Sequence, residues 1–190
     1  SFEQGGNRIA FDIGLANMLL NHLCRPLGIP FDREGEHARS GSVNTDLLLA
    51  LDDLPYYQKP FPKSTGYEWF RDAVLPVLDT FPDQPENQLR TGVQHIAGQI
   101  ARQVRALGEE AGGRVLVTGG GALNSYLVEM LQEQLGSKYK LVLPEAELIS
   151  FKEAMVFAFL GALRLEGRPN VLASVTGARR DSCSGVIFNP

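Results

Sequence analysis

Three consecutive glycines, Gly119 to Gly121, stand between a short apolar run and a helical pattern. Glycines let the main chain adopt positive φ angles and approach a ligand closely. A helix that follows them offers free N–H groups and a partial positive charge, which suits a phosphate or a ribose. The spacing is neither GxGxxG nor GxxxxGK[ST], which disfavours a Rossmann dinucleotide site and a P-loop. A tight turn that only packs the helix on a sheet explains the same glycines.

Two carboxylates have sequence contexts that could give them chemistry. Asp12 ends an apolar run and is followed by Gly14, an arrangement that places an acid in a crevice at the end of a strand. The alternative is that Asp12 caps the next helix. Glu153 completes a capping box with Ser150, so its spacing alone indicates no catalytic role.

Lys63 and Ser64 form a third candidate, because a lysine can pair with a phosphate. However, Thr65 and Glu68 have the spacing of a capping box, which explains that pair without a function. Residues 174–185 are polar and are predicted to form a solvated loop. No nucleophile elbow occurs in the sequence, so hydrolase chemistry has no support.

The composition limits the partners. The chain has 190 residues and a net charge of −4, so no electrostatic footprint indicates nucleic acid or an anionic membrane. Its two cysteines, Cys24 and Cys183, are predicted to be reduced thiols of a cytoplasmic protein, without a zinc site. The three histidines are expected to be surface or partly buried helix residues. We expect neither a membrane span nor a signal peptide.

Hydrophobic periodicity predicts the elements that must position these candidates. Helices are predicted where apolar residues recur every three or four positions, at 15–27, 43–51, 67–78, 89–107, 122–135 and 150–165. Strands are predicted at the short apolar runs 8–12, 114–118, 140–143 and 186–188. Loops are predicted at 30–42 and, crossing a surface, at 52–66. The first eight residues resemble a strand that enters a hairpin, so we expect part of the fold to precede residue 1.

The segment from 114 to 143 has the pattern of a βαβ unit, which predicts a buried parallel strand at 114–118. Asn44 or Ser42 is expected to be the N-cap of the helix predicted at 43–51. Four apolar side chains of the last long helix are expected to face the core: Phe151, Met155, Phe159 and Leu163. The fold class is therefore predicted to be α/β with a large share of helix.

Five motifs, in this order, resemble the C-terminal half of the anhydro-N-acetylmuramic acid kinase family. They are FDIGLAN, PKSTG, VLVTGGGALN, FKEAMVFAFLGALRL and SVTGAR. That family belongs to the actin-like ATPase superfamily, whose members close two RNase H-like lobes over ATP and substrate. The resemblance implies that residues 1–190 form one RNase H-like C-terminal kinase lobe, with a helix-rich surround and a short mixed sheet. It also implies that the N-terminal lobe is absent from the chain.

The implied activity is ATP- and Mg²⁺-dependent cleavage of the 1,6-anhydro bond of anhydro-N-acetylmuramic acid with phosphorylation of the 6-oxygen, a step of cell-wall recycling. The resemblance assigns the adenosine side to Gly119, Gly120, Gly121 and Asn124, and places Lys63 and Ser64 near the nucleotide. It assigns the cleft and the sugar or metal side to Asp12, Gly14, Asn17 and Glu153. Mg²⁺ is expected to bind through ATP and not directly to this chain.

The chain departs from the family pattern in two ways. Ile13, Leu15 and Ala16 replace residues of the usual FDTGPGN motif, so substrate contacts or loop geometry are expected to differ. The phosphate loop and the catalytic aspartate of the family are expected upstream of residue 1, so the chain alone should be inactive. An exposed apolar surface then predicts a homodimer or other self-association. The alternatives are a non-catalytic nucleotide-binding or regulatory module, and an α/β domain that binds no nucleotide.

Overall fold

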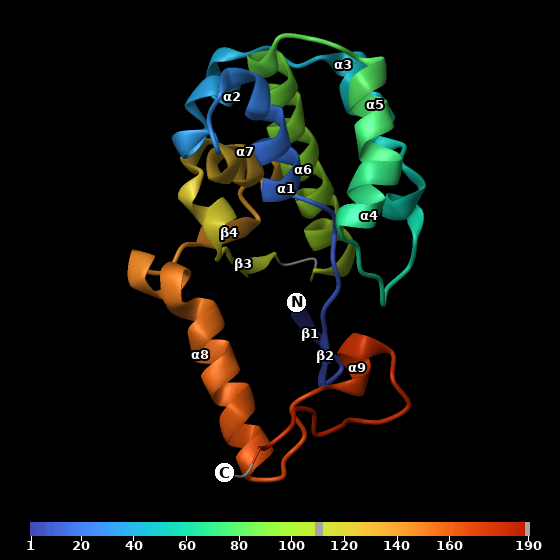
Figure 1. Ribbon diagram of the computed structural model, residues 1–190, viewed down its shortest axis with the longest axis vertical. Helices are drawn as coiled ribbons and strands as arrows, with labels where there is room; N and C mark the ends of the chain where they lie inside the picture. Colours follow the sequence, from blue (N-terminus) through green and yellow to red (C-terminus); the bar gives the residue numbers. More distant parts are fainter. Residues whose placement is uncertain (109–111, 189–190) are drawn as a thin grey trace.

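The computed structural model describes residues 1–108 and 112–188, and it confirms a mixed α/β chain with a large share of helix. Most helices gather in one part of the molecule, while α8, α9 and a β-hairpin extend below it (Figure 1). The strands are β1 Phe2–Gln4, β2 Asn7–Ile9, β3 Gly113–Leu116 and β4 Tyr139–Val142. The helices are α1 Asn17–Leu23, α2 Glu36–Ser40, α3 Thr45–Asp52, α4 Tyr67–Trp69, α5 Leu75–Thr80, α6 Pro85–Leu107, α7 Ser125–Leu135, α8 Ala146–Leu165 and α9 Ala173–Thr176.

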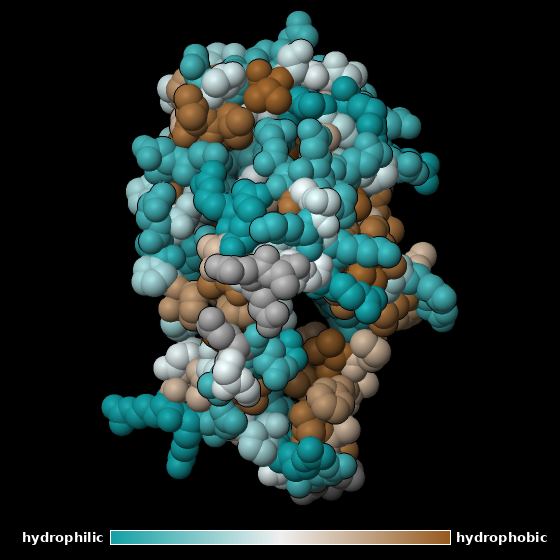
Figure 2. Space-filling model, turned by 180° about the vertical axis from the view of Figure 1, so that it is seen from behind, coloured by the Kyte–Doolittle hydropathy of each residue, from teal (hydrophilic) through white to brown (hydrophobic). Residues whose placement is uncertain are grey.

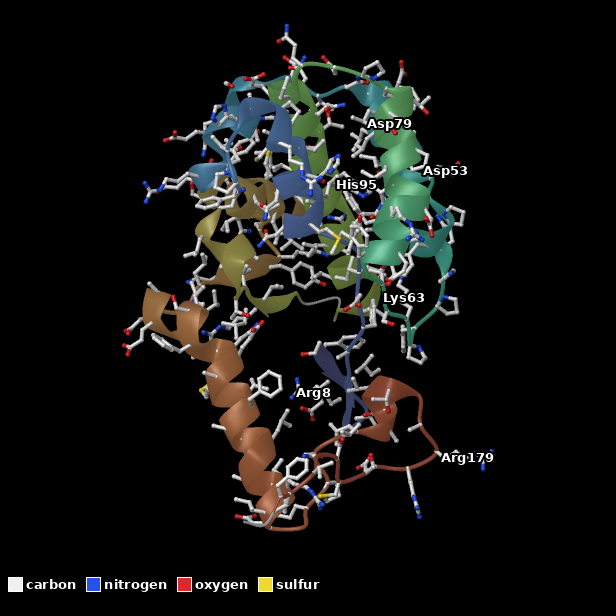
Figure 3. All side chains as sticks on the ribbon, in the orientation of Figure 1. Arg8, Asp53, Lys63, Asp79, His95 and Arg179 are labelled. Carbon is white, nitrogen blue, oxygen red and sulfur yellow. The ribbon has the colours of Figure 1, made fainter. Side chains whose placement is uncertain are left out.

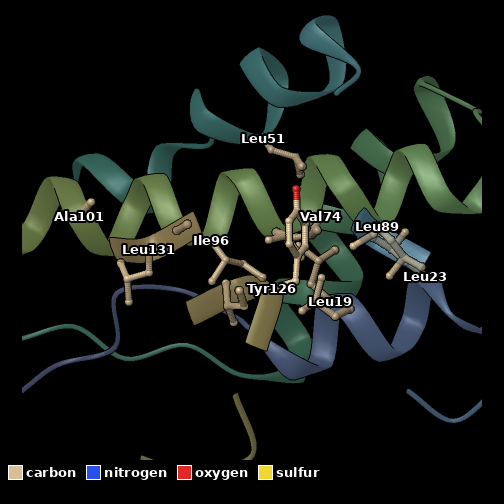
Figure 4. Close-up of a cluster of buried hydrophobic side chains, with 14 of the residues drawn as sticks. Leu19, Leu23, Leu51, Val74, Leu89, Ile96, Ala101, Tyr126 and Leu131 are labelled. Atoms are coloured by element: carbon tan, nitrogen blue, oxygen red, sulfur yellow. The ribbon is translucent and has the colours of Figure 1, made fainter. Parts of the chain in front are cut away.

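The long helix α6 organises the core, as its periodicity predicts. Its apolar face buries Leu89, Val93 and Ile96 completely or nearly so, against side chains of α1, α3 and α7 (Figure 4). Each such burial stabilises the fold by about 1.5–3 kcal/mol. The helix ends at Leu107, as predicted, because the main chain is extended at Gly108, whose N–H donates to the Val104 carbonyl.

The predicted βαβ unit is confirmed in its topology but not in its burial. β3 and β4 pair in parallel with α7 between them in the chain, and Gly136 ends α7. The prediction that β3 is buried is wrong, since Leu116 is 62% exposed. Within the described ranges β3 pairs only with β4, so no third strand lies on its other edge. Parallel strands are normally covered on both faces.

The expected hairpin at the start of the chain is confirmed, with Gly5 and Gly6 at positive φ in its turn. Its second strand ends at Ile9, so the strand predicted at 8–12 is shorter than expected. The expectation of one short mixed sheet is wrong. The described strands form two separate two-stranded sheets, one antiparallel and one parallel, because β1 and β2 pair only with each other.

Helix α8 differs most from its prediction. It begins at Ala146, so Ser150 lies inside it and donates to the Ala146 carbonyl instead of forming a capping box with Glu153. The core-facing assignment of its apolar residues is wrong: Phe151, Met155 and Phe159 are 54–62% exposed, and Leu163 is only half-buried. Brown side chains accordingly gather over the region of α8 on the face in Figure 2. An apolar helix without buried residues lacks a cover.

Three smaller differences have local causes. The segment 30–42, predicted as a loop, contains α2, whose first N–H groups bind the buried Asp32 carboxylate. The segment 52–66 lies at the surface as predicted, with residues 58–62 exposed, but Tyr56 and Tyr57 are buried on a 3₁₀ turn, Pro55–Gln58. Residues 186–188 form no strand. The predicted helices at 43–51 and 67–78 are confirmed, the first capped by Asn44.

Candidate functional site

A cavity of about 240 Å³ lies between residues 11–16, here called the Asp12 segment, and α6. Asp12 is the one acidic residue in its lining. The rest of the lining is Phe11, Ile13, Gly14, Leu15, Ala16, Tyr57, His95, Ile96, Gln99 and Ile100. A carboxylate at the wall of a largely apolar cavity can bind a hydroxyl group or accept a proton from water.

Asp12 is held on both its main chain and its side chain. Its N–H donates to the Lys63 carbonyl at 3.1 Å, and its carbonyl accepts from the Tyr56 hydroxyl at 2.7 Å. Its carboxylate oxygen Oδ2 accepts from the Thr65 N–H at 3.0 Å. The alternative in which Asp12 caps α1 is therefore wrong, because the carboxylate binds the 63–65 loop and α1 has no side-chain cap.

The three glycines form a second part of the site, here called the glycine loop. Gly119 has φ 78° and ψ −178°, a conformation that is essentially restricted to glycine. A Cβ on Gly120 would lie 2.8 Å from Nδ2 of Asn17, the first residue of α1. Asn17 thus joins the glycine loop to the end of the Asp12 segment. Bare main chain in an open loop fits a nucleotide, because side chains there would fill the space a ligand needs.

Asn124 and α8 hold the glycine loop from its two ends. The Asn124 side chain accepts from the Leu127 N–H at 3.0 Å and so caps α7. On the other side, the Lys152 ammonium donates to the Thr118 hydroxyl at 2.8 Å. Glu153, the next residue of α8, is exposed. These contacts fix the loop between the end of β3 and the start of α7.

A buried hydrogen-bonded chain lies behind the Asp12 segment. The Tyr57 hydroxyl is 2.8 Å from Nε2 of His95, and Nδ1 of His95 is 2.5 Å from Oδ1 of Asp52. Gln99 and Arg102 also donate to the Asp52 carboxylate, at 3.0 and 3.1 Å. Figure 3 shows His95 inside the helical part of the molecule. Its 2% exposure contradicts the expectation of a surface or partly buried histidine.

Neither a metal cluster nor a membrane span was found in residues 1–108 and 112–188. No group of three or more His, Cys, Asp or Glu side chains there could hold a metal ion. No helix in those ranges combines the length and the apolar character needed to cross a membrane.

Comparison with known proteins identifies the family. A sequence model of anhydro-N-acetylmuramic acid kinase matches residues 2–190. The chain belongs to the anhydro-N-acetylmuramic acid kinase family. A relative from Streptomyces coelicolor with that name is 39% identical over 96% of this chain and 48% of its own length. One from Vibrio cholerae is 37% identical over 99% of this chain and 52% of its own length. The chain spans about half the length of the curated relatives it matches.

The structure of this anhydro-N-acetylmuramic acid kinase homologue brings together some predicted site residues and separates others. Asp12 and Gly14 line the cavity, and Asn17 contacts the glycine loop. Lys63 lies with Asp12, where its ammonium donates to the Tyr56 carbonyl at 3.3 Å, and Ser64 is exposed beside it. No described contact joins Lys63 or Ser64 to the glycine loop. Their expected place near the nucleotide stays a prediction.

The capping box predicted for Thr65 and Glu68 in this kinase-family chain is wrong. Helix α4 begins at Tyr67, with Gly66 before it and no side-chain cap. The Thr65 hydroxyl is buried and has no hydrogen-bond partner among the described residues. The Thr65 main chain is used differently, because its N–H binds the Asp12 carboxylate.

Sequence reasoning missed Tyr57 and His95, which line the cavity of this kinase homologue, and Asp52, which binds His95 from outside the lining. His95 is buried on α6, where a histidine needs hydrogen-bond partners. The positions one turn away on either side are not apolar, so the helix periodicity did not mark it. Nothing in the local pattern around Tyr57 or Asp52 identifies those partners, which lie 38 and 43 residues away.

We predict that Gly14→Ala destabilises this kinase-family chain. The new Cβ would lie 2.9 Å from Cε1 and 3.0 Å from the hydroxyl of Tyr57, closer than van der Waals contact allows. Overpacking of this kind costs about 1–3 kcal/mol, measured by urea unfolding. Gly98→Ala in α6 is the matched control, because its Cβ would meet no atom within 4 Å. Removing a helical glycine there should stabilise by about 0.5–1 kcal/mol. Equal stabilities of the two variants would refute the contact.

We predict that Asp52 stabilises the kinase-family fold at neutral pH and not in acid. Burial alone raises the pKa of Asp52, but the hydrogen bonds from His95, Gln99 and Arg102 outweigh burial and lower the pKa. A lowered folded pKa gives stability that is present above the unfolded pKa of about 3.9. That stability is lost as the pH falls through the folded value.

Asp52→Asn should therefore cost about 1–3 kcal/mol at pH 7. The difference from the parent should shrink as the pH falls below about 4, in urea-unfolding curves at stepped pH. A difference that stays constant down to pH 2 would contradict the lowered pKa.

Proposed function

We propose that the chain is the C-terminal half of an ATP-dependent anhydro-N-acetylmuramic acid kinase. The reaction hydrolyses the 1,6-anhydro bond and phosphorylates the 6-oxygen, in the cytoplasm, where ATP is available. The observation that carries the proposal is the contact of Asn17 with Gly120, which joins the glycine loop to the Asp12 segment in a member of this family. Nucleotide and sugar would then meet at the start of α1.

The glycine loop and Asn124 form the adenosine side in this proposal. The support is the glycine-only conformation of Gly119 and the Asn124 cap, which together present bare main chain at a fixed position. Bound ATP with Mg²⁺ supplies the phosphoryl group and the charge neutralisation that its transfer requires. Glu153, which follows the Lys152 that contacts Thr118, is assigned to the sugar and metal side.

Asp12 is the sugar-facing carboxylate. The resemblance places the catalytic base upstream of residue 1. The geometry supports a second assignment, in which Asp12 itself accepts the proton of the water that attacks the anomeric carbon. Its Oδ2 is oriented by the Thr65 N–H, and its main chain is fixed at both the N–H and the carbonyl. A carboxylate held in place on a residue of the cavity lining suits a general base.

Residues 1–190 are proposed to be the C-terminal lobe of an RNase H-like, actin-like ATPase fold, and the half that they do not include is proposed to be its N-terminal lobe. Two features support this proposal. β3 and α8 present apolar surface without a cover, including Leu116 and Phe157, which is 71% exposed. The relatives are about twice as long as the matched region. The second lobe would cover the surface that is brown over α8 in Figure 2.

A chimera tests the function. The half of the Streptomyces coelicolor relative that this chain does not match is fused to this chain, and mass spectrometry follows the conversion of anhydro-N-acetylmuramic acid with ATP. We expect N-acetylmuramic acid 6-phosphate from the chimera and none from the chain alone. The intact relative is the positive control. A folded chimera that binds ATP without turnover would favour the non-catalytic module, which the departures Ile13, Leu15 and Ala16 allow.

The uncovered helix predicts self-association of the isolated chain. Phe151, Phe157 and Phe159 on α8 are each more than 60% exposed, so burial between two copies is favourable. Sedimentation should detect dimers or larger species at micromolar concentration. Phe157→Glu should shift them toward monomer, whereas Leu49→Glu, at an equally exposed site on α3, should not. A monomeric parent chain would contradict the prediction.

A further inference from the structure

The buried chain of Tyr57, His95 and Asp52 has no role in the reaction proposed above. It joins three separate elements: the 3₁₀ turn Pro55–Gln58, the middle of α6 and the end of α3. His95 is 2% and Tyr57 9% exposed, and the Asp52 side chain is 27% exposed. Two buried polar groups and a half-buried carboxylate cost stability unless their hydrogen bonds are well made, so their arrangement requires an explanation.

The partners fix which way each proton points. The Asp52 carboxylate accepts, so Nδ1 of His95 carries the hydrogen that it donates. In the neutral ring Nε2 must then accept, which makes the Tyr57 hydroxyl the donor. Gln99 and Arg102 donate to Asp52 and hold the carboxylate from the other side. The chain therefore has one preferred orientation from Asp52 to Tyr57.

The far end of the chain meets the Asp12 segment. The Tyr57 ring packs so closely on Gly14 that a Cβ there would lie 2.9 Å from Cε1. The adjacent Tyr56 donates its hydroxyl to the Asp12 carbonyl at 2.7 Å. One short turn thus contacts the Asp12 segment at two points, two residues apart. The turn is itself held in place by the hydrogen bond between the Tyr57 hydroxyl and His95.

We propose that Asp52, His95 and Tyr57 form a positioning relay that fixes the Asp12 segment against α6. None of the three is a catalytic residue in this proposal. They act through Gly14 and Asp12, and the relay fixes the main chain that carries the Asp12 carboxylate. The importance of that position rests on the proposed function, but the relay itself does not. A purely packing role for Tyr57 needs only its ring, whereas the relay also needs its hydroxyl and a carboxylate that does not touch Gly14.

Amide NMR spectra of the full chain separate the two. In Asp52→Asn and Tyr57→Phe we expect the Gly14 and Asp12 amide signals to shift, and the His95 ring nitrogens to lose the Nδ1–H tautomer signature in Asp52→Asn. Asp53→Asn is the matched control, since Asp53 is the exposed next residue. Its Gly14 and Asp12 signals should stay in place. If Asp52→Asn leaves them as unchanged as Asp53→Asn does, the relay is overturned.

Kinetics of the chimera provide the second arm. Tyr57→Phe keeps the ring on Gly14, so we expect kcat to fall about 10- to 100-fold with KM little changed, because a misplaced group mainly affects the chemical step. Unchanged kcat in an active chimera would overturn the functional part of the relay. If the chimera has no activity, the proposed function fails while the amide shifts still decide whether the relay exists.

Discussion

Asp12→Asn in the chimera is expected to lower kcat by about 10²- to 10⁴-fold, the range that a general base contributes. Asparagine keeps the size of the side chain, and its oxygen can still accept from the Thr65 N–H. What it loses is the negative charge and the ability to take a proton. KM should change only a few-fold, because the cavity keeps its shape. Steady-state kinetics with varied anhydrosugar at saturating ATP measures both constants.

The pattern of the two constants distinguishes the assignments of Asp12. Asp53→Asn is the control, as an exposed carboxylate outside the cavity lining, and it should leave kcat unchanged. A raised KM with an unchanged kcat would mean that Asp12 only binds the sugar, with the base upstream as the resemblance expects. Unchanged values of both constants would remove Asp12 from the site.

Sequence alone could predict the elements whose signals are local. The apolar positions of α6 recur along one face over 23 residues, and only an amphipathic helix satisfies that pattern. The same holds for the parallel pairing of β3 with β4, because a glycine-rich turn and a helix of suitable length separate them. Helix ends were less accurate, as at α8, where Ser150 and Glu153 have capping-box spacing inside a helix that starts at Ala146.

Burial could not be predicted where the described residues provide no cover. Residues 154–163 of α8 include no polar side chain, which predicts a buried helix, but Phe159 is 62% exposed because nothing in the described structure covers it. The wrong prediction of burial therefore indicates that α8 needs a partner surface. A helix that is apolar all round is stable in water only against a partner. The same argument applies to β3, whose pattern also predicts burial on both faces.

The candidate site also has a part that local sequence signals predict and a part that they do not. The glycine loop could be predicted, because glycines between a strand and a helix have a local physical meaning. The contact of Asn17 with that loop and of Lys63 with Asp12 could not, since 103 and 51 residues separate the partners in the chain. The Tyr57, His95 and Asp52 relay is also non-local. The capping-box spacing of Thr65 and Glu68 predicted a helix cap, whereas the Thr65 N–H binds the Asp12 carboxylate.

Gly119→Ala is expected to weaken ATP binding to the chimera by about 5- to 100-fold. Gly119 has φ 78° and ψ −178°, where an alanine is strained by about 1–3 kcal/mol. A Cβ there would meet no atom within 4 Å, so a steric clash is not the cause. The loop either keeps its shape under strain or turns away from the ligand. Every 1.4 kcal/mol lost from binding corresponds to a tenfold change in Kd. Calorimetry with a non-hydrolysable ATP analogue measures it.

Gly161→Ala is the matched control, because its Cβ also meets no atom within 4 Å and its φ is not positive. It should leave the ATP affinity unchanged. The thermal stability of Gly119→Ala separates the two responses of the loop: a lower Tm means that the strained shape persists, and an unchanged Tm means that the loop has turned away. An unchanged ATP affinity in Gly119→Ala would refute the nucleotide assignment, because the left-handed main chain of the glycine loop would then have no ligand to explain it.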